Sequence, residues 1–296
     1  MQLFIDRLLH GFNSGIIYGF LALALVCTYR GSRALNLAQG EMAMFCTFIA
    51  YTLVNHGFPV ILAIACAAAI GAIGGGAIER TLIRPLGRNA DYPVLLVTIG
   101  LFLGLNALAG VIWGGEPKAF PSVVPDNPND YVSIFGSREH YQSLVIFGLL
   151  VILVAVLYGT FRFTRLGLGM RAAAGNPDSA MLLGVRVNRM NSLGWVLAGA
   201  IGALLGPLIA PSTTVSTTLF FTYIIYAVAA ATLGGFDSPI GAVLGGIIIG
   251  VAESLVSSYV SFVGDSLGLA VALVILLLVL LVRPSGLLGS RETARV

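Results

Sequence analysis

The chain has 296 residues, of which 57% are hydrophobic and 10% are charged, and its formal net charge is +3. A soluble domain carries about 25% charged residues, so these side chains cannot cover a globule with polar surface. The composition excludes a soluble enzyme, a nucleic-acid-binding protein and a disordered chain, and it favours a polytopic membrane protein.

Apolar segments of about 20 residues, the length that crosses a bilayer as a helix, recur along the whole chain. They predict about nine spans, at residues 11–29, 37–55, 59–78, 92–113, 142–161, 191–210, 219–235, 239–260 and 266–282. The second and the seventh each adjoin a polar stretch that contains glycine. The first is not a signal peptide, because Asp6 offsets Arg7 and no small-residue cleavage site follows. The predicted fold is an all-α polytopic membrane protein whose residues 1–296 form a single transmembrane domain.

Arginine placement predicts the orientation, because cytoplasmic loops of membrane proteins are rich in arginine and lysine. If the spans alternate and the C-terminus is cytoplasmic, thirteen of the sixteen basic residues lie in inner segments, and Arg7, Lys118 and Arg138 lie outside. We therefore predict an outer N-terminus, a periplasmic loop at 114–141 and a cytoplasmic loop at 162–190. The outer loop is either a solvated connector or a docking site for an external partner.

Several residue types argue for packing rather than for chemistry. Glycines four residues apart predict close helix contacts, and these pairs are Gly71/Gly75, Gly202/Gly206, Gly241/Gly245 and Gly246/Gly250. The three cysteines and three histidines have no ligand spacing, so no metal site is predicted. The one lysine, Lys118, does not lie in a phosphate-binding loop, so the chain has no Walker A motif. No catalytic motif is present, and we expect a chain that is not an enzyme.

A short helix is predicted within the inner loop. Asn176 suits the N-cap, Pro177 the first helical position and Asp178 the first turn, where the helix dipole favours a negative charge. Gly184 can end the helix. One apolar side consists of Ala180, Met181 and Leu183. A helix of this length is marginal alone, so it packs on the bundle or on a partner protein.

Four stretches, in this order, carry a resemblance to a known family. They are Leu35–Glu41 (LNLAQGE), the inner-loop residues Arg171, Asn176, Pro177, Ala180 and Gly184, Gly234–Ala242 (GGFDSPIGA) and Arg283–Gly289 (RPSGLLG). Together they resemble the branched-chain amino acid permeases of bacterial ABC importers, in the superfamily that includes ribose-type permeases. Length and the absence of an N-terminal extension resemble the H-type subunit. Asp237 departs from the family pattern, which has glycine there, and puts the local backbone geometry in doubt.

The resemblance implies a division of labour among several chains. Two permease subunits, the second a different chain, form the pore in the bacterial inner membrane, and a periplasmic binding protein delivers the substrate. Two ATPase subunits bind ATP and Mg²⁺, so this chain needs no cofactor of its own. The inner-loop residues Arg171, Asn176, Pro177, Ala180 and Gly184 would couple the permease to the ATPases.

Four polar residues at predicted membrane depth are candidates for the translocation path. Carboxylates within a membrane are costly and are functional candidates, which singles out Glu41 and Glu253. Glu41 could instead cap the second span, and Glu253 could pair across helices. Asn36 and Gln39 lie in a polar break, and such a break is tolerated mainly beside a cavity.

The predicted function is a permease subunit for branched-chain or other hydrophobic amino acids. Related permeases for urea, short amides or other small polar solutes share these motifs, so a small polar solute is the alternative substrate. A self-sufficient channel or secondary transporter and a membrane scaffold without transport activity are alternatives of other classes.

Overall fold

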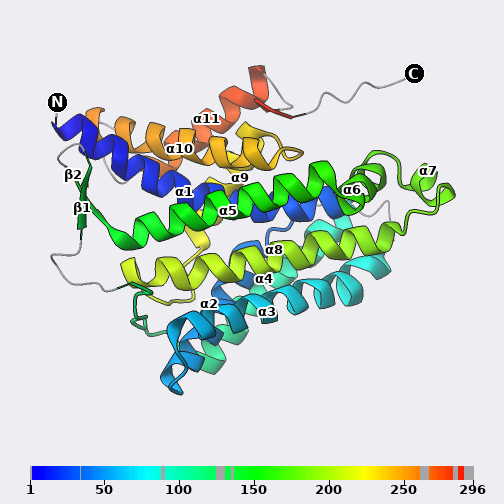
Figure 1. The fold of residues 1–296 in the computed structure, drawn as a ribbon, viewed down its shortest axis with the longest axis horizontal. Coiled ribbons are helices and arrows are strands. Elements are labelled where there is room, and N and C mark those ends of the chain that lie inside the picture. Colours follow the sequence, from blue (N-terminus) through cyan, green and yellow to red (C-terminus); the bar gives the residue numbers. More distant parts are fainter. Residues whose placement is uncertain are drawn as a thin grey trace.

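The structure is a computed structural model that describes residues 2–33, 35–87, 91–124, 131–134, 137–260, 267–282 and 286–289. Long helices dominate it (Figure 1). The helices of the bundle are α1 (Gln2–Ser32), α2 (Gln39–Asn55), α3 (Val60–Ile78), α4 (Asp91–Trp113), α5 (Tyr141–Phe163), α8 (Val187–Ile209), α9 (Phe221–Gly234), α10 (Pro239–Tyr259) and α11 (Gly268–Val282). The short elements are η1 (Glu79–Ile83), η2 (Arg84–Leu86), β1 (Tyr131–Ile134), β2 (Ser137–His140), α6 (Arg165–Gly175), α7 (Pro177–Leu182) and η3 (Ala210–Ser212).

Each of the nine predicted spans contains a helix, so the polytopic, helical membrane fold is confirmed. Within the described residues, six helices are long and apolar enough to cross a bilayer. They are Gln2–Ser32, Val60–Leu86, Tyr92–Trp113, Tyr141–Phe163, Val187–Ser212 and Pro239–Tyr259. Helices α2, α9 and α11 have 17, 14 and 15 residues, which is shorter than a full crossing. The sequence did not predict the antiparallel pair of β1 and β2, which lies between α4 and α5.

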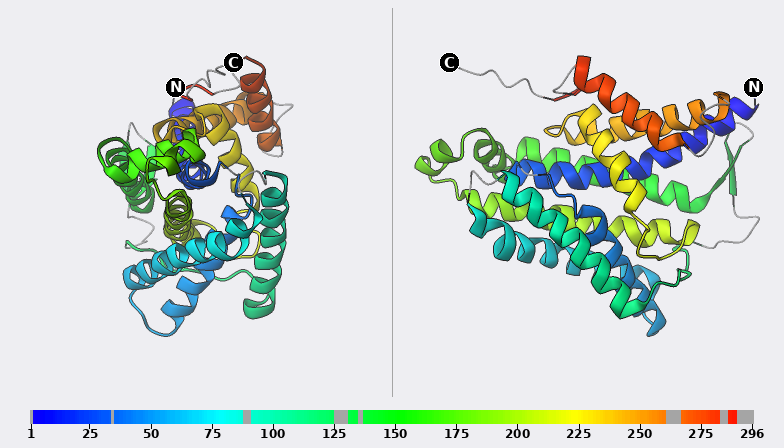
Figure 2. Two further views of the ribbon diagram at one scale, coloured as in Figure 1. Left: turned by 90° about the vertical axis from the view of Figure 1, so that its right-hand side faces the viewer. Right: turned by 180° about the vertical axis from the view of Figure 1, so that it is seen from behind.

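Helices α1 and α8 run side by side through the middle of the bundle. Helices α5, α9 and α10 pack on α1, while α2 and α3 pack on α8 and α4 packs on α2 (Figures 1 and 2). Phe20–Cys27 of α1 have no exposed surface, and neither does Trp195 of α8. Helix α11, in contrast, exposes most of its leucines. The buried core therefore follows α1 and α8, and the outer helices present apolar side chains to lipid.

All four predicted glycine pairs lie at close helix contacts. The backbones of α1 and α10 meet where a Cβ on Gly246 would stand 2.6 Å from the Cα of Gly19 and 2.7 Å from the carbonyl oxygen of Gly15. A Cβ on Gly71 would stand 2.6 Å from the carbonyl oxygen of Gly199, which joins α3 to α8. Larger side chains at these positions would separate the helices, so glycine is required by packing.

The second and seventh predicted spans are the short interior helices α2 and α9. At 1.5 Å per residue, α9 is about 21 Å long, against about 30 Å of hydrocarbon. Both begin inside the protein, after the link at 35–38 and the segment at 213–220. The first turn of α2 lies against α8 and the start of α9, since Gln39 donates to the carbonyl oxygen of Ala198 and a Cβ on Gly40 would stand 3.1 Å from the Cβ of Phe220. Protein groups therefore surround the start of α2, as an unwound link at membrane depth requires.

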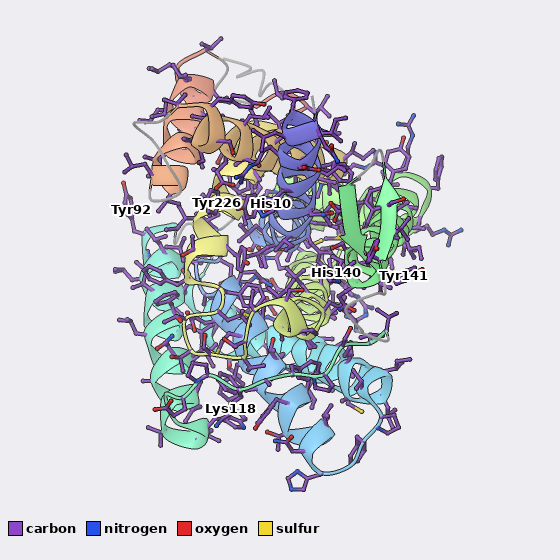
Figure 3. The ribbon with its side chains drawn as sticks, turned by 90° about the vertical axis from the view of Figure 1, so that its left-hand side faces the viewer. His10, Tyr92, Lys118, His140, Tyr141 and Tyr226 are labelled. Carbon is purple, nitrogen blue, oxygen red and sulfur yellow. The ribbon has the colours of Figure 1, made fainter. Side chains whose placement is uncertain are left out.

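Different polar contacts hold the two ends of the bundle. At one end, Arg84 binds Glu79 at 2.8 Å and Ser192 at 2.7 Å, which ties the end of α3 to the start of α8. At the opposite end, Asn13 of α1 donates to Glu139 of β2, and the backbones of Lys118 and Val215 form a bridge. Figure 3 looks at this second end, with His10, Lys118, His140 and Tyr141 labelled.

Candidate functional site

The inner loop folds into two helices that project from one end of the molecule, at the right in Figure 1. Thr164 caps α6 by accepting from the amide of Gly167, and Asn176 caps α7 by accepting from the amide of Ser179 at 2.9 Å. Gly184 has a φ of +81°, a conformation that favours glycine and ends the helix. The predicted cap, the proline start and the glycine end of α7 are confirmed, while α6 was not predicted as a separate helix.

Helix α7 has an inner and an outer side. Ala180 is 2% exposed and packs with Ala173 and Val187. Leu182 and Leu183 are 90% and 83% exposed at the tip of the loop. Helix α7 therefore packs on α6 and α8 through Ala180, while the side chains of Leu182 and Leu183 make few contacts within the chain. Such a pair of exposed leucines next to charged residues is typical of a contact with another protein.

Arg171 lies on the exposed side of α6 and lines a cavity together with Arg30 and Arg162 from the ends of α1 and α5. The predicted coupling residues therefore fall into two places. Asn176, Pro177, Ala180 and Gly184 shape α7, whereas Arg171 lies at the cavity between α6 and the ends of α1 and α5.

Asn36 of the link before α2 and Gln39, the first residue of α2, are both fully buried. The amide nitrogen of Asn36 donates to the side-chain oxygen of Gln39 at 3.1 Å, and its oxygen accepts from the backbone N–H of Ala38. Gln39 in turn donates to the carbonyl oxygen of Ala198 at 2.9 Å. These amides hold the unwound link against α8, and their hydrogen bonds go to the protein itself.

The two carboxylates lie in different places. Glu41 of α2 is 1% exposed, and one of its oxygens accepts from Asn106 of α4 at 3.2 Å. Asn106 also donates to the carbonyl oxygen of Thr217, so Glu41 belongs to a contact between α2, α4 and the segment before α9. Glu253 of α10 is half-buried and accepts from the hydroxyl of Tyr18 at 3.4 Å.

Three tyrosines next to Glu253 were not anticipated from the sequence. The rings of Tyr18 and Tyr226 stack with centroids 4.4 Å apart, and the ring of Tyr223 lies 6.1 Å from that of Tyr18. Their spacing at 223 and 226 places two of them on one face of α9, but only the fold adds Tyr18. Aromatic faces beside a carboxylate provide a favourable environment for an ammonium group.

A cavity of about 310 Å³ lies next to this cluster. Tyr223 is one of its lining residues. The others are His10, Asn13, Ser14, Ile16, Ile17, Ser143, Ile146, Ile209, Ser212 and Thr213. Hydroxyls, an amide and isoleucine side chains therefore line the same cavity. Such a mixed lining suits a small solute that has polar and apolar parts. The structure brings Glu253 near this cavity through the tyrosines, and it places Asn36, Gln39 and Glu41 elsewhere.

A family model described as "Branched-chain amino acid transport system / permease component" matches residues 7–282. The chain belongs to this permease family.

Named relatives agree with this family. The chain is 30% identical, over 68% of its length and 69% of the relative, to the high-affinity branched-chain amino acid transport system permease protein BraD of Pseudomonas aeruginosa. It is 29% identical, over 68% of each chain, to the corresponding LivH protein of Salmonella typhimurium. The xylose/arabinose import permease protein XylH of Sulfolobus acidocaldarius is 25% identical over 57% of this chain and 46% of its own, which supports the wider superfamily.

A solved structure, PsaBC from Streptococcus pneumoniae in complex with Fab, shares the fold. The TM-score is 0.52 at 14% identity, with 95% of this chain and 96% of that chain covered. Membership of the permease family and the apolar helices make this chain a multi-pass protein of the bacterial inner membrane. Membership of this family of ABC transporter permease components implies ATPase and substrate-binding partners.

Two of the stretches that resemble this permease family meet in the structure. The amides of Leu287 and Leu288 donate to the carbonyl oxygens of Leu233 and Gly234. The third and fourth stretches therefore form one unit where α10 begins. Among the described residues, Arg33 is the one non-glycine residue with a positive φ, so Asp237 fits its turn without the strain that its departure from glycine had suggested.

Replacing Gln39 with leucine is expected to lower the free energy of unfolding by about 1–3 kcal/mol, because the carbonyl of Ala198 and the amide of Asn36 lose a buried partner. Thermal unfolding of the purified chain in detergent would measure this loss. Gln142→Leu is the matched comparison, because Gln142 likewise donates to a buried carbonyl, that of Leu208, away from the link. It measures what a buried glutamine bond of this kind contributes to the free energy of unfolding elsewhere in the chain. If Gln39→Leu is as stable as the wild type, the link is not held by this pair.

Proposed function

We propose that this chain is a permease subunit of a bacterial ABC importer and forms part of the path for branched-chain or other hydrophobic amino acids. Family membership and the printed names of the relatives from Pseudomonas and Salmonella support this substrate class. The exposed tip of α7 is the observation that carries the coupling role, because its two leucines have no cover on this chain.

The proposal includes a topology of nine spans with the N-terminus outside and the C-terminus in the cytoplasm. Its support is the grouping of the arginines. Arg30, Arg33, Arg162 and Arg171 meet around one cavity, and Arg84 contacts the start of α8 at the same end. The end with the β1–β2 pair then faces the periplasm, where a binding protein would dock.

Partner ATPase subunits would bind α7 and supply ATP and Mg²⁺. Arg171, Asn176, Pro177, Ala180 and Gly184 shape or flank this contact, and they transmit movement because α6 packs on α1, α5 and α8. Two ATPases, a second and different permease chain and a periplasmic binding protein complete the importer. This chain holds no cofactor and catalyses no reaction.

For the path, we propose that substrate passes the outer cavity and the Glu253–tyrosine cluster. The carboxylate and aromatic faces suit the ammonium group of an amino acid, and the isoleucines suit its side chain. Asn36, Gln39 and Glu41 would contact substrate only when the link before α2 moves away from α8. A urea or short-amide permease is the alternative, because the hydroxyls of Ser14, Ser143 and Ser212 also suit an uncharged polar solute.

Uptake by the purified importer in liposomes tests the proposal. The complex is co-purified through this chain from its native membrane, reconstituted, and supplied with labelled leucine, urea or acetamide together with its binding protein. ATP-dependent uptake of leucine is the expected result. Uptake of urea or acetamide in its place would establish the alternative substrate class, and flux without ATP or partners would establish a channel or secondary transporter.

A further inference from the structure

A second cavity, which the amino acid path does not use, lies at the inner end of the bundle, which the left view of Figure 2 faces. Its volume is about 500 Å³. It forms where the ends of α1 and α5, the face of α6 and the start of α10 come together. The lining residues are Arg30, Arg33, Tyr158, Phe161, Arg162, Met170, Arg171, Ala174, Gly175, Asp237, Ser238, Pro239, Ile240 and Leu288.

This basic cavity carries a surplus of positive charge. Four of its lining residues are arginines, and Asp237 is the one acidic residue among the described lining residues. The guanidinium carbon of Arg30 lies 4.6 Å from the centre of the Phe161 ring, and that of Arg162 lies 5.6 Å from the centre of the Tyr158 ring. Stacking on a ring positions a guanidinium and leaves its N–H groups free to bind an anion. Phosphate oxygens match such a group of arginines best.

The start of α10 adds to the positive potential. Ser238 caps this helix by accepting from the amide of Gly241, and Pro239 occupies its first position. The positive end of the helix dipole therefore points into a cavity that already holds four guanidiniums. The arginines dominate, and the helix end reinforces them.

The surroundings of the cavity indicate that its ligand is a lipid. Tyr158 lines the cavity and is 37% exposed, and the ring of Phe163, which is 77% exposed, lies 6.3 Å from that of Tyr158. Tyrosine is enriched at the headgroup level of a bilayer. Ile240, Leu244 and Ile248, spaced four residues apart, form one exposed face of α10 that starts at the cavity. An apolar stripe that leaves a basic cavity offers a place for an acyl chain below a phosphate.

We propose that this basic cavity binds the phosphate headgroup of an anionic phospholipid of the inner leaflet, with an acyl chain along Ile240, Leu244 and Ile248. Basic pockets between membrane helices on the cytoplasmic side bind such headgroups. The lipid would join α6, which leads to the exposed α7, to α1 and α10. This proposal goes beyond amino acid transport and rests on the proposed function only for the topology that places the cavity at the inner leaflet. Lipid binding can be measured without substrate, ATP or ATPase, so its failure is distinguishable from a failure of the transport proposal.

Native mass spectrometry of the purified full-length chain tests the proposal. The chain is titrated with phosphatidylglycerol, with phosphatidylcholine of the same acyl chains, and with inorganic phosphate. Phosphatidylglycerol is expected to bind at least about tenfold more tightly than phosphatidylcholine. Each lost arginine is expected to weaken binding about fivefold, so that Arg30→Gln with Arg162→Gln weakens it about 25-fold.

Arg186→Gln with Arg189→Gln is the matched control, because it removes two exposed charges from the same loop outside the cavity. Leu244→Ser is expected to weaken binding of phosphatidylglycerol without affecting that of inorganic phosphate. Arg171→Gln is a second variant should the double variant fail to fold.

Four results would overturn the proposal. The first is equal binding of the two lipids, and the second is equal loss in the cavity variants and in the control. The third is displacement of phosphatidylglycerol by an equal concentration of inorganic phosphate, which would indicate a site for free anions. The fourth is retention of the lipid by cavity variants that no longer co-purify with the ATPase, which would make the cavity a protein contact and not a lipid site.

Discussion

Changing Leu182 and Leu183 together to aspartate is expected to reduce ATP-driven uptake about 30-fold or more, while the amount of folded permease in the membrane stays the same. Both side chains are more than 80% exposed, so their loss breaks few contacts within the chain, and surface substitutions of this kind change the free energy of unfolding by about 0.5 kcal/mol or less. A buried leucine pair at the centre of a protein contact can contribute about 2 kcal/mol or more to binding. Co-purification of the ATPase and uptake by the reconstituted importer measure the two effects.

Leu182→Met with Leu183→Met is the control, because it keeps the apolar surface and removes the branching alone. It is expected to retain coupled uptake. Normal coupled uptake in the aspartate variant would show that α7 does not contact the ATPase.

Arg171→Glu, or a residue inserted next to Gly184, is expected to leave ATPase activity intact and to uncouple it from transport, because each change alters how α6 and α7 join the bundle.

Changing Gly246 to valine is expected to lower the free energy of unfolding by about 3 kcal/mol or more and to remove most of the folded chain from the membrane. Its Cβ would stand 2.6 Å from the Cα of Gly19, and backbone cannot move aside as a flexible side chain can. The contact of α1 with α10 is among the most extensive in the bundle, so opening it exposes the core along α1. Thermal unfolding in detergent, together with the yield of monodisperse protein, measures the loss.

Gly104→Val is the matched control, since Gly104 of α4 lies in a membrane helix and a Cβ there would meet nothing within 4 Å. It is expected to unfold within a few degrees of the wild type. Equal stability of the two variants would show that α1 and α10 do not pack as closely as the structure has them.

Local patterns in the sequence were sufficient for much of the fold. Segment length and hydropathy located helices in all nine predicted spans, because a chain in lipid must satisfy its backbone within each span. The spacing of glycines predicted close contacts, and Asn176, Pro177 and Gly184 predicted the two ends of α7, because caps depend on neighbouring residues alone. The lengths of α2 and α9 were not predictable in this way, since α2 begins against α8 and α9 packs on α1, α10 and α11, and these contacts come from other parts of the chain.

The candidate sites depended more on the fold. Glu253 was singled out by its sequence position, but Tyr18 comes from α1 and reaches it across more than two hundred residues. The structure shows Asn36 and Gln39 hydrogen-bonded within the protein, and their place beside a path stays a prediction. A hydropathy pattern reveals that a polar group lies at membrane depth, but it does not reveal which atoms satisfy it.

Composition and span length were enough to identify a multi-pass membrane protein, and four short motifs carried its resemblance to a permease family, because these patterns are local. Which polar groups meet, and where, came from the tertiary structure. It gathered arginines from three helices around one cavity, separated Glu41 from Glu253, and left Leu182 and Leu183 uncovered. Each of these outcomes depends on contacts between helices distant in sequence, and such contacts are set by close packing of whole helix faces rather than by the residues on either side.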